Sequence, residues 1–294
     1  MPISTKTAKA IECFNRMHSG EVSAEILEEW ERRLVVLFCG QISQSCCAAD
    51  YFDDLALILR ESHGVDYAVW SFSPSEDRGK CFEVTYARLD FLGELRGIVE
   101  SIRPRVEERI REFEAVGARM DPGEIFSELC FCILTANYTA EGGIRIQQSL
   151  KQHFMSKPVQ EMAWSLRSLG HRFPNKRAEF ICGARHLCEG ILQALSMGDC
   201  AAREWLVENV KGLGYKEASH FLRNVGRKDV AIIDRHILRF LHQKGLINSI
   251  PRTLSRRRYL SIERLLSAIS SALGVSLAEL DLYLWYAMTG KVLK

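Results

Sequence analysis

The chain has 294 residues, of which 47% are apolar and 26% are charged, and its formal net charge is +2. That length is enough for one large domain or two ordinary ones, and the composition is that of a globular protein. Apolar runs such as residues 34–39 are far shorter than the roughly 20 residues that cross a bilayer, which argues against a membrane-spanning helix. No apolar stretch follows the lysines of the N-terminus, so we expect no secretory signal and a cytoplasmic, intracellular protein.

Charge is unevenly distributed along the chain. Residues 1–87 carry 8 lysines and arginines against 14 acidic residues, whereas residues 88–294 carry 31 against 23. An acidic block joined to a basic block indicates a polyanionic partner for the second block only. We therefore expect nucleic acid to bind residues 88–294.

Ten cysteines occur in the chain, with no C-x-x-C pair. Most lie in apolar segments, and we interpret them as reduced, mostly buried thiols of an intracellular protein. Metal binding or oxidation at the adjacent residues Cys46 and Cys47 is a minor alternative. We expect no metal and no cofactor.

Residues 1–87 are predicted to form a small α+β region. Apolar residues at helical spacing predict a helix over residues 23–38 and a shorter one over residues 53–60. Residues 65–72 and 81–86 are rich in β-branched and aromatic residues and flank a polar loop, which predicts a β-hairpin. No catalytic pattern occurs in this region, and its acidic balance argues against DNA contact. We interpret it as a partner-binding module, a stabilising cap or the seat of a second function.

From residue 88 to residue 294 the pattern is almost entirely helical, which predicts an all-α domain and a mainly α fold class. Asp121 is an expected N-cap with Pro122 at the first helical position, and Gly142-Gly143 is interpreted as a break. The expected helices cover residues 89–99, 104–116, 122–135, 144–154, 158–168, 175–194, 200–210, 215–225, 234–243, 256–273 and 277–289.

The segment KGLGYK, residues 211–216, is the most informative one in the chain. It is typical of a tight hairpin between two helices, in which Gly212 and Gly214 are expected to supply the positive φ of a sharp reversal. Backbone N–H groups at the start of the second helix can bind a phosphate oxygen. We therefore predict DNA-backbone contacts at Lys211, Gly212 and Gly214, although most such glycine turns only connect helices.

Lys216 is predicted in the first turn of the helix that follows the hairpin. A cation there meets the positive end of the helix dipole, so the position favours the neutral amine. A neutral amine is what a Schiff-base nucleophile needs. The alternative is a solvated surface lysine.

Asp234 follows an apolar run and precedes another predicted helix, so it is an expected N-cap. Backbone N–H groups hold a capping carboxylate ionised and in one place. Such a carboxylate can stabilise a sugar with oxocarbenium character, as in glycoside hydrolysis. Capping and catalysis are compatible roles. His236, two residues later, is interpreted as structural.

Several segments resemble one protein family. Residues 209–226, NVKGLGYKEASHFLRNVG, resemble the helix–hairpin–helix of archaeal-type 8-oxoguanine DNA glycosylase/lyases of the HhH-GPD superfamily, and residues 231–238 resemble their aspartate segment. Residues 129–143 and the tail, residues 282–294, match as well. The resemblance covers about residues 88–294 and leaves the N-terminal region outside it. No cysteine follows Cys200, so the four-cysteine iron–sulfur loop that ends some DNA repair glycosylases is absent.

The resemblance implies a two-lobed all-α fold that binds its substrate in the cleft between the lobes. It implies that Lys216 attacks C1′ of the damaged nucleotide while Asp234 assists departure of the base. A β-elimination then nicks the strand 3′ to the lesion, after the base has been flipped out of the stack.

The same resemblance implies roles in recognition for four further residues. Phe173 and Trp285 would sandwich the flipped base, a role that aromatic side chains serve for extruded bases. Lys294 would help to distinguish 8-oxoguanine from guanine, a role that depends on the chain ending there. Asn137 would probe the DNA near the lesion. Without the resemblance, Phe173 and Trp285 would be interpreted as core aromatics, which is the usual place of such residues.

Three alternatives remain beside a bifunctional enzyme that acts on double-stranded DNA containing 8-oxoguanine. The first is a glycosylase for another damaged base, which Lys294 argues against. The second is a non-catalytic DNA-binding module, which has no need of both Lys216 and Asp234. The third, a protein-interaction scaffold, fits residues 1–87 alone, where we allow for a protein partner.

Overall fold

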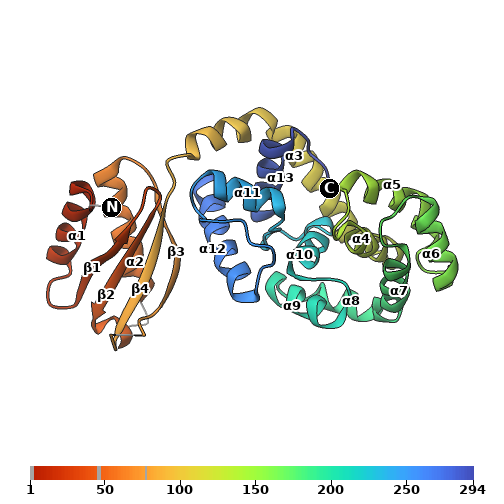
Figure 1. The fold of residues 1–294 in the computed structure, drawn as a ribbon, viewed down its shortest axis with the longest axis horizontal. Helices are drawn as coiled ribbons and strands as arrows, with labels where there is room; N and C mark the ends of the chain where they lie inside the picture. The colour runs from red at the N-terminus through yellow and green to blue at the C-terminus, as the bar shows by residue number, and fades with distance from the viewer. Residues whose placement is uncertain (1–2, 45–47, 77) are drawn as a thin grey trace. The chain divides into compact units, whose positions relative to one another are not determined.

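The computed structural model describes residues 3–44, 48–76 and 78–294 (Figure 1). The chain divides into two compact units, each made of two separate segments. One unit contains Met1–Glu100 and Leu238–Val275, and the other contains Ser101–Ile237 and Ser276–Lys294. The assignment of residues 1–87 to a separate domain stays a prediction.

The first unit begins with an α+β arrangement. Its four-stranded antiparallel sheet has the strand order β1-β2-β4-β3. The predicted hairpin is confirmed, because β3 pairs with β4. The elements are α1 (Thr5–Met17), β1 (Val22–Glu29), β2 (Arg33–Gly40), a 3-10 turn (Gln41–Gln44), α2 (Ala48–His63), β3 (Tyr67–Pro74) and β4 (Cys81–Arg88).

The helix predicted over residues 23–38 is wrong, because this segment forms β1 and β2. Leu27 and Trp30, which suggested a helical face, are 40% exposed, so their spacing does not mark a core. In β2, Val36 and Phe38 alternate along one buried face, as a strand requires. The helix α1 was not predicted, and α2 extends beyond the predicted residues 53–60.

The two faces of the sheet contact different helices. α1 and α2 share a core with one face, in which the rings of Phe14, Phe38 and Phe52 meet edge to face. From β3, Trp70 donates its indole N–H to the carbonyl of Ser261 at 3.0 Å. Ser261 lies in α12 (Arg256–Leu273), so the N-terminal sheet and α12 belong to one packed unit.

One pair of cysteines corrects the interpretation that all ten are reduced. Cys39 in β2 lies opposite Cys81 in β4, and the two form a disulfide. They are 42 residues apart, and only the pairing of the two strands brings them together. Cys46 and Cys47 lie outside the described residues. Cys130 and Cys132 are buried, and burial raises the pKa of both thiols.

A single helix, α3 (Leu92–Arg119), replaces the two predicted over residues 89–99 and 104–116. Pro104 lies inside it and removes one backbone donor. The helix continues through the proline because buried apolar residues recur three or four positions apart on both sides of it. They are Val99, Ile102, Val106, Ile110 and Phe113.

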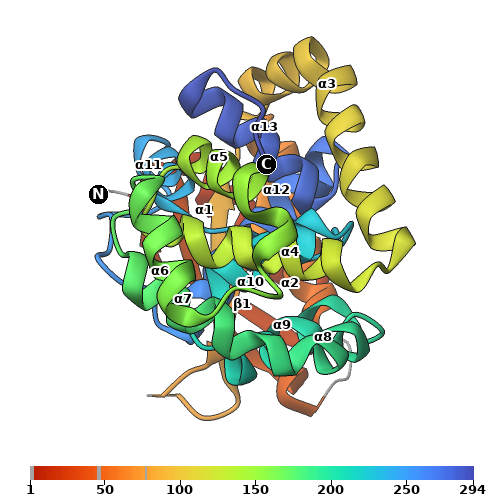
Figure 2. The ribbon, with the colours of Figure 1, turned by 90° about the vertical axis from the view of Figure 1, so that its right-hand side faces the viewer.

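In the second unit, α4 (Pro122–Thr135) lies at the centre and contacts α5, α7 and α10 (Figure 2). Its predicted start is confirmed, since the Asp121 carboxylate accepts the Glu124 N–H at 2.7 Å. The remaining helices are α5 (Ala140–Leu150), α6 (Val159–Ser168), α7 (Pro174–Ala184), α8 (Cys188–Ala194), α9 (Asp199–Asn209), α10 (Tyr215–Asn224), α11 (Arg235–Gln243) and α13 (Leu277–Thr289), of which α11 runs from this unit into the first.

The break predicted at Gly142-Gly143 is wrong, because both glycines lie within α5. A Cβ on Gly143 would come within 2.6 Å of the Thr135 side chain and 3.1 Å of the Phe131 ring. The glycines therefore allow α5 to pack closely on α4. The predicted helix over residues 175–194 is divided by a 3-10 turn at Arg185–Leu187.

Within the described part of the chain, no single helix has the length and apolar composition needed to cross a membrane. The consecutive helices α12 and α13 pass that test only when they are taken together as a bent pair.

Candidate active site

The predicted hairpin connects α9 to α10. Gly212 has φ of +94°, and a Cβ there would come within 2.4 Å of the Phe180 ring. Leu213 is buried and anchors the turn in the core. Gly214 corrects the expectation of positive φ: its backbone is extended, with φ −99° and ψ −174°, and it is the N-cap of α10. Glycine has no side chain to accept a hydrogen bond from the first turn of α10, so no capping side chain covers the backbone N–H groups there.

The two glycines should therefore respond differently to substitution. Gly212→Ala should lower the free energy of unfolding by about 2 kcal/mol or more, because alanine in a left-handed conformation costs roughly 1–2 kcal/mol before the clash with Phe180 is added. Gly214→Ala should cost less than about 1 kcal/mol, since only the weaker capping preference is lost. Urea denaturation of both variants measures this, and equal losses would contradict the assignment of Gly212 as the reversal point.

A cavity of about 420 Å³ lies beside the hairpin within the second unit, and α10, α13 and the start of α11 contribute to its wall. It brings together four of the residues singled out in the sequence: Lys216, Asp234, Trp285 and Lys294. Its described lining residues are Thr135, Tyr138, Thr139, Ala140, Glu141, Lys216, His220, Arg223, Ile232, Asp234, His236, Asp281, Leu282, Trp285, Thr289, Lys291, Leu293 and Lys294.

Lys216 is the second residue of α10 and reaches the cavity from the first turn of that helix. Its side chain is 25% exposed, and Nζ lies 3.9 Å from Glu217 Oε1, longer than a hydrogen bond. The amine is thus accessible from the cavity.

Asp234 is held in place from two sides. Its Oδ1 accepts the backbone N–H groups of His236 at 2.8 Å and Ile237 at 2.9 Å, which confirms the predicted N-cap. Its Oδ2 accepts the indole N–H of Trp285 at 3.4 Å. The Trp285 ring also meets the His236 ring edge to face, with centroids 5.4 Å apart. The carboxylate, the indole and the start of α11 therefore form one fixed group.

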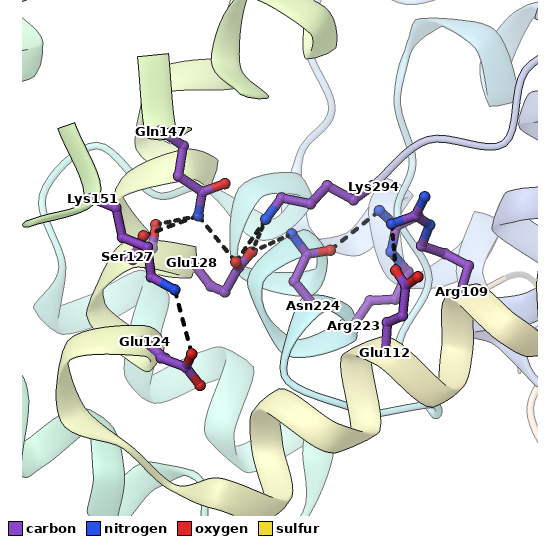
Figure 3. Close-up of polar contacts among 10 residues, drawn as sticks. All are labelled: Arg109, Glu112, Glu124, Ser127, Glu128, Gln147, Lys151, Arg223, Asn224 and Lys294. Carbon is purple, nitrogen blue, oxygen red and sulfur yellow. Dashed lines mark hydrogen bonds and ion pairs between the residues drawn. The ribbon is translucent and has the colours of Figure 1, made fainter. Parts of the chain in front are cut away.

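Lys294 lies on the cavity wall with its ammonium bound to Glu128 of α4. Nζ is 2.6 Å from Glu128 Oε1 and 2.8 Å from Oε2 (Figure 3). It also lies 4.8 Å from the centre of the Phe131 ring. The side chains of Lys294 and Glu128 are only 18% and 11% exposed.

A buried ion pair lies next to the catalytic candidates. Arg223 of α10 pairs with Asp281 of α13, and both side chains are almost completely enclosed. Burial, together with the Asp234 carboxylate, raises the pKa of Asp281 to about 6, against the opposing effect of the Arg223 guanidinium. Asp281 thus adds a buried carboxyl group to a cavity that Asp234 and Glu141 also line.

His220 follows Lys216 by four residues and so lies on the same side of α10. It is buried, and neither ring nitrogen has a hydrogen-bond partner among the described residues. Burial holds the pKa of this imidazole well below its ordinary value, and the charges of Arg223, Lys216 and Lys294 act in the same direction. In the folded protein its protonation is therefore shifted to lower pH than that of an ordinary histidine.

This burial predicts a pH dependence of stability. Between the lowered pKa of folded His220 and 6.5, the unfolded chain binds the additional proton, so the free energy of unfolding rises with pH through that window. The contribution is about 1.4 kcal/mol per pH unit for one proton. His220→Phe should remove this part of the slope when urea unfolding is measured at pH 5.5, 6.0 and 6.5. If the free energy of unfolding depends on pH equally in the variant and the wild type, His220 is not held neutral in the folded protein.

Phe173 is not among the residues that line the cavity. It precedes α7 with its side chain 41% exposed, and the Arg172 guanidinium lies 5.0 Å from the centre of its ring. Its backbone N–H donates to His171 Nδ1 at 3.0 Å, while His171 Nε2 binds the Leu134 carbonyl at 3.0 Å. His171, which is buried, therefore connects Phe173 to α4.

The predicted DNA-contacting residues lie outside the cavity lining, and all of them except Gly212 are exposed. Asn137 has φ of +57° in the turn between α4 and α5. Lys211 and Gly214 are exposed in the hairpin, and Gly212 is half-buried.

Sequence reasoning missed His220, Arg223, Asp281 and Glu128. Helical spacing contains a signal for three of them: His220 and Arg223 follow Lys216 by four and seven residues, and Asp281 precedes Trp285 by four, so each shares a helix face with a catalytic or recognition candidate. Glu128 has no such signal. Among the described residues no group of three or more His, Cys, Asp or Glu side chains is placed to hold a metal ion.

Comparison with known proteins shows which family the chain resembles. Residues 106–275 match the family model described as 8-oxoguanine DNA glycosylase. The chain is 53% identical over 195 residues to the 8-oxoguanine DNA glycosylase/AP lyase of Methanocaldococcus jannaschii, an alignment that covers 66% of this chain and 93% of the relative.

Two solved structures are similar to the chain over the same region. The 8-oxoguanine DNA glycosylase of Thermotoga maritima is 46% identical with a TM-score of 0.67, covering 70% of this chain and 99% of that one. The Methanocaldococcus jannaschii glycosylase/lyase in complex with a 15mer DNA containing 8-oxoguanine is 50% identical with a TM-score of 0.66, covering 68% and 100%.

Proposed function

Because the chain belongs to the 8-oxoguanine DNA glycosylase family, we propose that it removes 8-oxoguanine from double-stranded DNA and then cleaves the strand at the abasic site. It is then both a DNA N-glycosylase and a DNA-(apurinic or apyrimidinic site) lyase, and it acts inside the cell on chromosomal DNA. The observation that carries this proposal is the cavity itself, where an accessible amine, an anchored carboxylate and an indole ring line one space.

Lys216 is the nucleophile of the proposed reaction. Its neutral amine forms a bond to C1′ of the flipped nucleotide while the bond from C1′ to the base breaks, and the base leaves with a proton. The sugar ring then opens: the C1′–O4′ bond breaks, O4′ takes up a proton, and C1′ and the lysine nitrogen form the Schiff base. This Schiff base acidifies the C2′ hydrogen, so loss of that proton expels the 3′ phosphate and nicks the strand. Accessibility of the amine from the cavity supports this role.

Asp234 stabilises the positive charge that develops on the sugar as the base departs. Two backbone N–H groups and one indole N–H already hold the carboxylate in position, so little reorganisation is needed in the transition state. The same contacts orient Trp285 at the cavity wall, where its ring can stack on an extruded base.

The remaining roles concern recognition. We assign Phe173 to the opposite face of the flipped base and Lys294 to discrimination between 8-oxoguanine and guanine. Lys211, Gly212 and Gly214 contact the DNA backbone, and Asn137 contacts DNA near the lesion. Exposure of Phe173, Asn137 and Lys211 fits contact with a ligand that covers them.

Borohydride trapping tests the proposal. The protein is mixed with a duplex containing one 8-oxoguanine, the imine is reduced, and the adduct is mapped by peptide mass spectrometry. We expect a covalent adduct at Lys216. Base release without an adduct would indicate a monofunctional glycosylase, and neither release nor adduct would favour another lesion or a non-catalytic DNA-binding module.

A further inference from the structure

We propose that Glu128 is a positioning residue for base discrimination, which acts by holding Lys294 on the cavity wall. The proposal rests on the function proposed above, since it assigns a support to one of its recognition residues. Glu128 itself is not among the residues that line the catalytic cavity, so its effect on the base passes through Lys294.

Every oxygen of the Glu128 carboxylate is used by a protein donor (Figure 3). Oε1 accepts Gln147 Nε2 at 3.0 Å and Lys294 Nζ at 2.6 Å, and Oε2 accepts Asn224 Nδ2 at 3.1 Å and Lys294 Nζ at 2.8 Å. The donors come from α5, α10 and the C-terminal segment, and Glu128 from α4. The carboxylate therefore joins four parts of the second unit at one point.

Lys294 is the only cation that the described residues place on this carboxylate. Glu128 is 9% exposed, and a buried carboxylate without a cation is strongly unfavourable, so the pair has a reason to persist. Lysine side chains ordinarily lose about 2 kcal/mol of rotamer entropy when they are fixed. Here two short contacts and the Phe131 ring restrain the ammonium.

The neighbouring Lys291 shows what an unrestrained arrangement looks like. It also lines the cavity, but its pair with Glu141 is solvent-exposed, with side chains 57% and 54% accessible. Exposed pairs of this kind contribute little. Of the two lysines at this end of the chain, Lys294 is thus the one that the fold holds in position.

The same network reaches the other side of the cavity. Asn224, which donates to Glu128, accepts a hydrogen bond from Arg223 NH2 at 3.3 Å, and Arg223 pairs with Asp281. Lys294 and Asp281 both line the cavity, so Glu128 is connected to the first directly and to the second through Asn224 and Arg223. A site that recognises polar groups discriminates well only when its walls are fixed.

The test is the selectivity of Glu128→Gln. The amide keeps the size of the side chain but has no charge. It also replaces one acceptor oxygen by an NH2 group, which faces the donors that the carboxylate accepts in the wild type. Single-turnover base release is measured on duplexes with 8-oxoguanine or guanine at one site. We expect the ratio of the two rates to fall about tenfold, within the range for coupled neighbours. Nicking of a preformed abasic duplex, which needs no base recognition, should change less than about threefold.

Glu124→Gln is the matched control. Glu124 lies one turn earlier in α4 and also binds a lysine, Lys151, at 3.3 Å, but it does not line the catalytic cavity. Its variant should keep the wild-type selectivity. A second variant, Lys294→Met, should lower selectivity by itself, and adding Glu128→Gln to it should have no further effect. Additive losses in the double variant would overturn action through Lys294.

Reductive methylation gives a readout that does not depend on activity. In the folded wild type, Lys294 should be modified several-fold more slowly than Lys291, and Glu128→Gln should remove the difference. If the wild type shows no preference for 8-oxoguanine, the proposed function fails, but the methylation rates still show whether Glu128 restrains the Lys294 side chain. If wild type is selective and Glu128→Gln changes neither selectivity nor labelling, the positioning role is wrong.

Discussion

Lys216→Gln is expected to abolish base release, strand nicking and the borohydride adduct together. Glutamine keeps the polarity and the approximate length of the side chain but has no nucleophilic amine, so no bond to C1′ can form. The loss should be about 10⁴-fold or more in the single-turnover rate, the scale seen when a covalent nucleophile is removed. Affinity for the damaged duplex should stay within about threefold, because phosphate contacts dominate it.

Lys211→Gln is the matched control for that result. Lys211 lies in the same hairpin but is exposed and outside the cavity. Its loss should weaken DNA binding and reduce the salt dependence of the affinity by about one phosphate contact, while the rate at saturating enzyme is retained. If the Lys216→Gln variant nicks DNA at the wild-type rate, Lys216 is not the nucleophile.

Asp234→Asn is expected to slow base release by about 10²–10³-fold, the size typical when one preorganised electrostatic group is lost. Asparagine is as good an N-cap as aspartate, so α11 should keep its start and the protein its fold. In this variant no carboxylate stands at position 234 to stabilise the positive charge that develops on the sugar. Single-turnover base release on the 8-oxoguanine duplex measures the effect.

The abasic duplex separates the two roles of Asp234. A preformed abasic site needs no departure of a base, so nicking of it should be less affected than release of 8-oxoguanine. Thermal unfolding within a few degrees of wild type is also expected. If Asp234→Asn unfolds at much lower temperature, capping of α11 is the main role of this residue. If base release is unchanged, Asp234 takes no part in the reaction.

Local chemistry in the sequence was sufficient to locate the main candidates. The hairpin, the N-cap at Asp234 and the start of α4 depend on residues within a few positions of one another, and the structure confirms all three. The roles of Lys216 and Asp234 in catalysis stay predictions. Gly214 was assigned the wrong conformation because a turn with two glycines does not show which one has positive φ; contact with Phe180, 32 residues away, explains why Gly212 must be a glycine.

The N-terminal region shows the opposite case. Apolar residues over residues 23–38 are compatible with a helical or an extended arrangement, and pairing with β4 decided for strands. The same pairing placed Cys39 opposite Cys81. Gly142-Gly143 looked like a break because the close approach of α5 to α4 that requires glycine there is invisible along the chain.

The sequence by itself therefore determined the mainly helical fold, the hairpin, the capping carboxylate and the family resemblance, since each depends on short-range spacing or on an ordered set of motifs. Only the tertiary structure decided that Lys216, Asp234, Trp285 and Lys294 line one cavity. It also decided that Glu128 holds Lys294, 166 residues away along the chain. The physical reason is that burial, ion pairing and contact across a cavity depend on distances in space, which no local pattern of residues encodes.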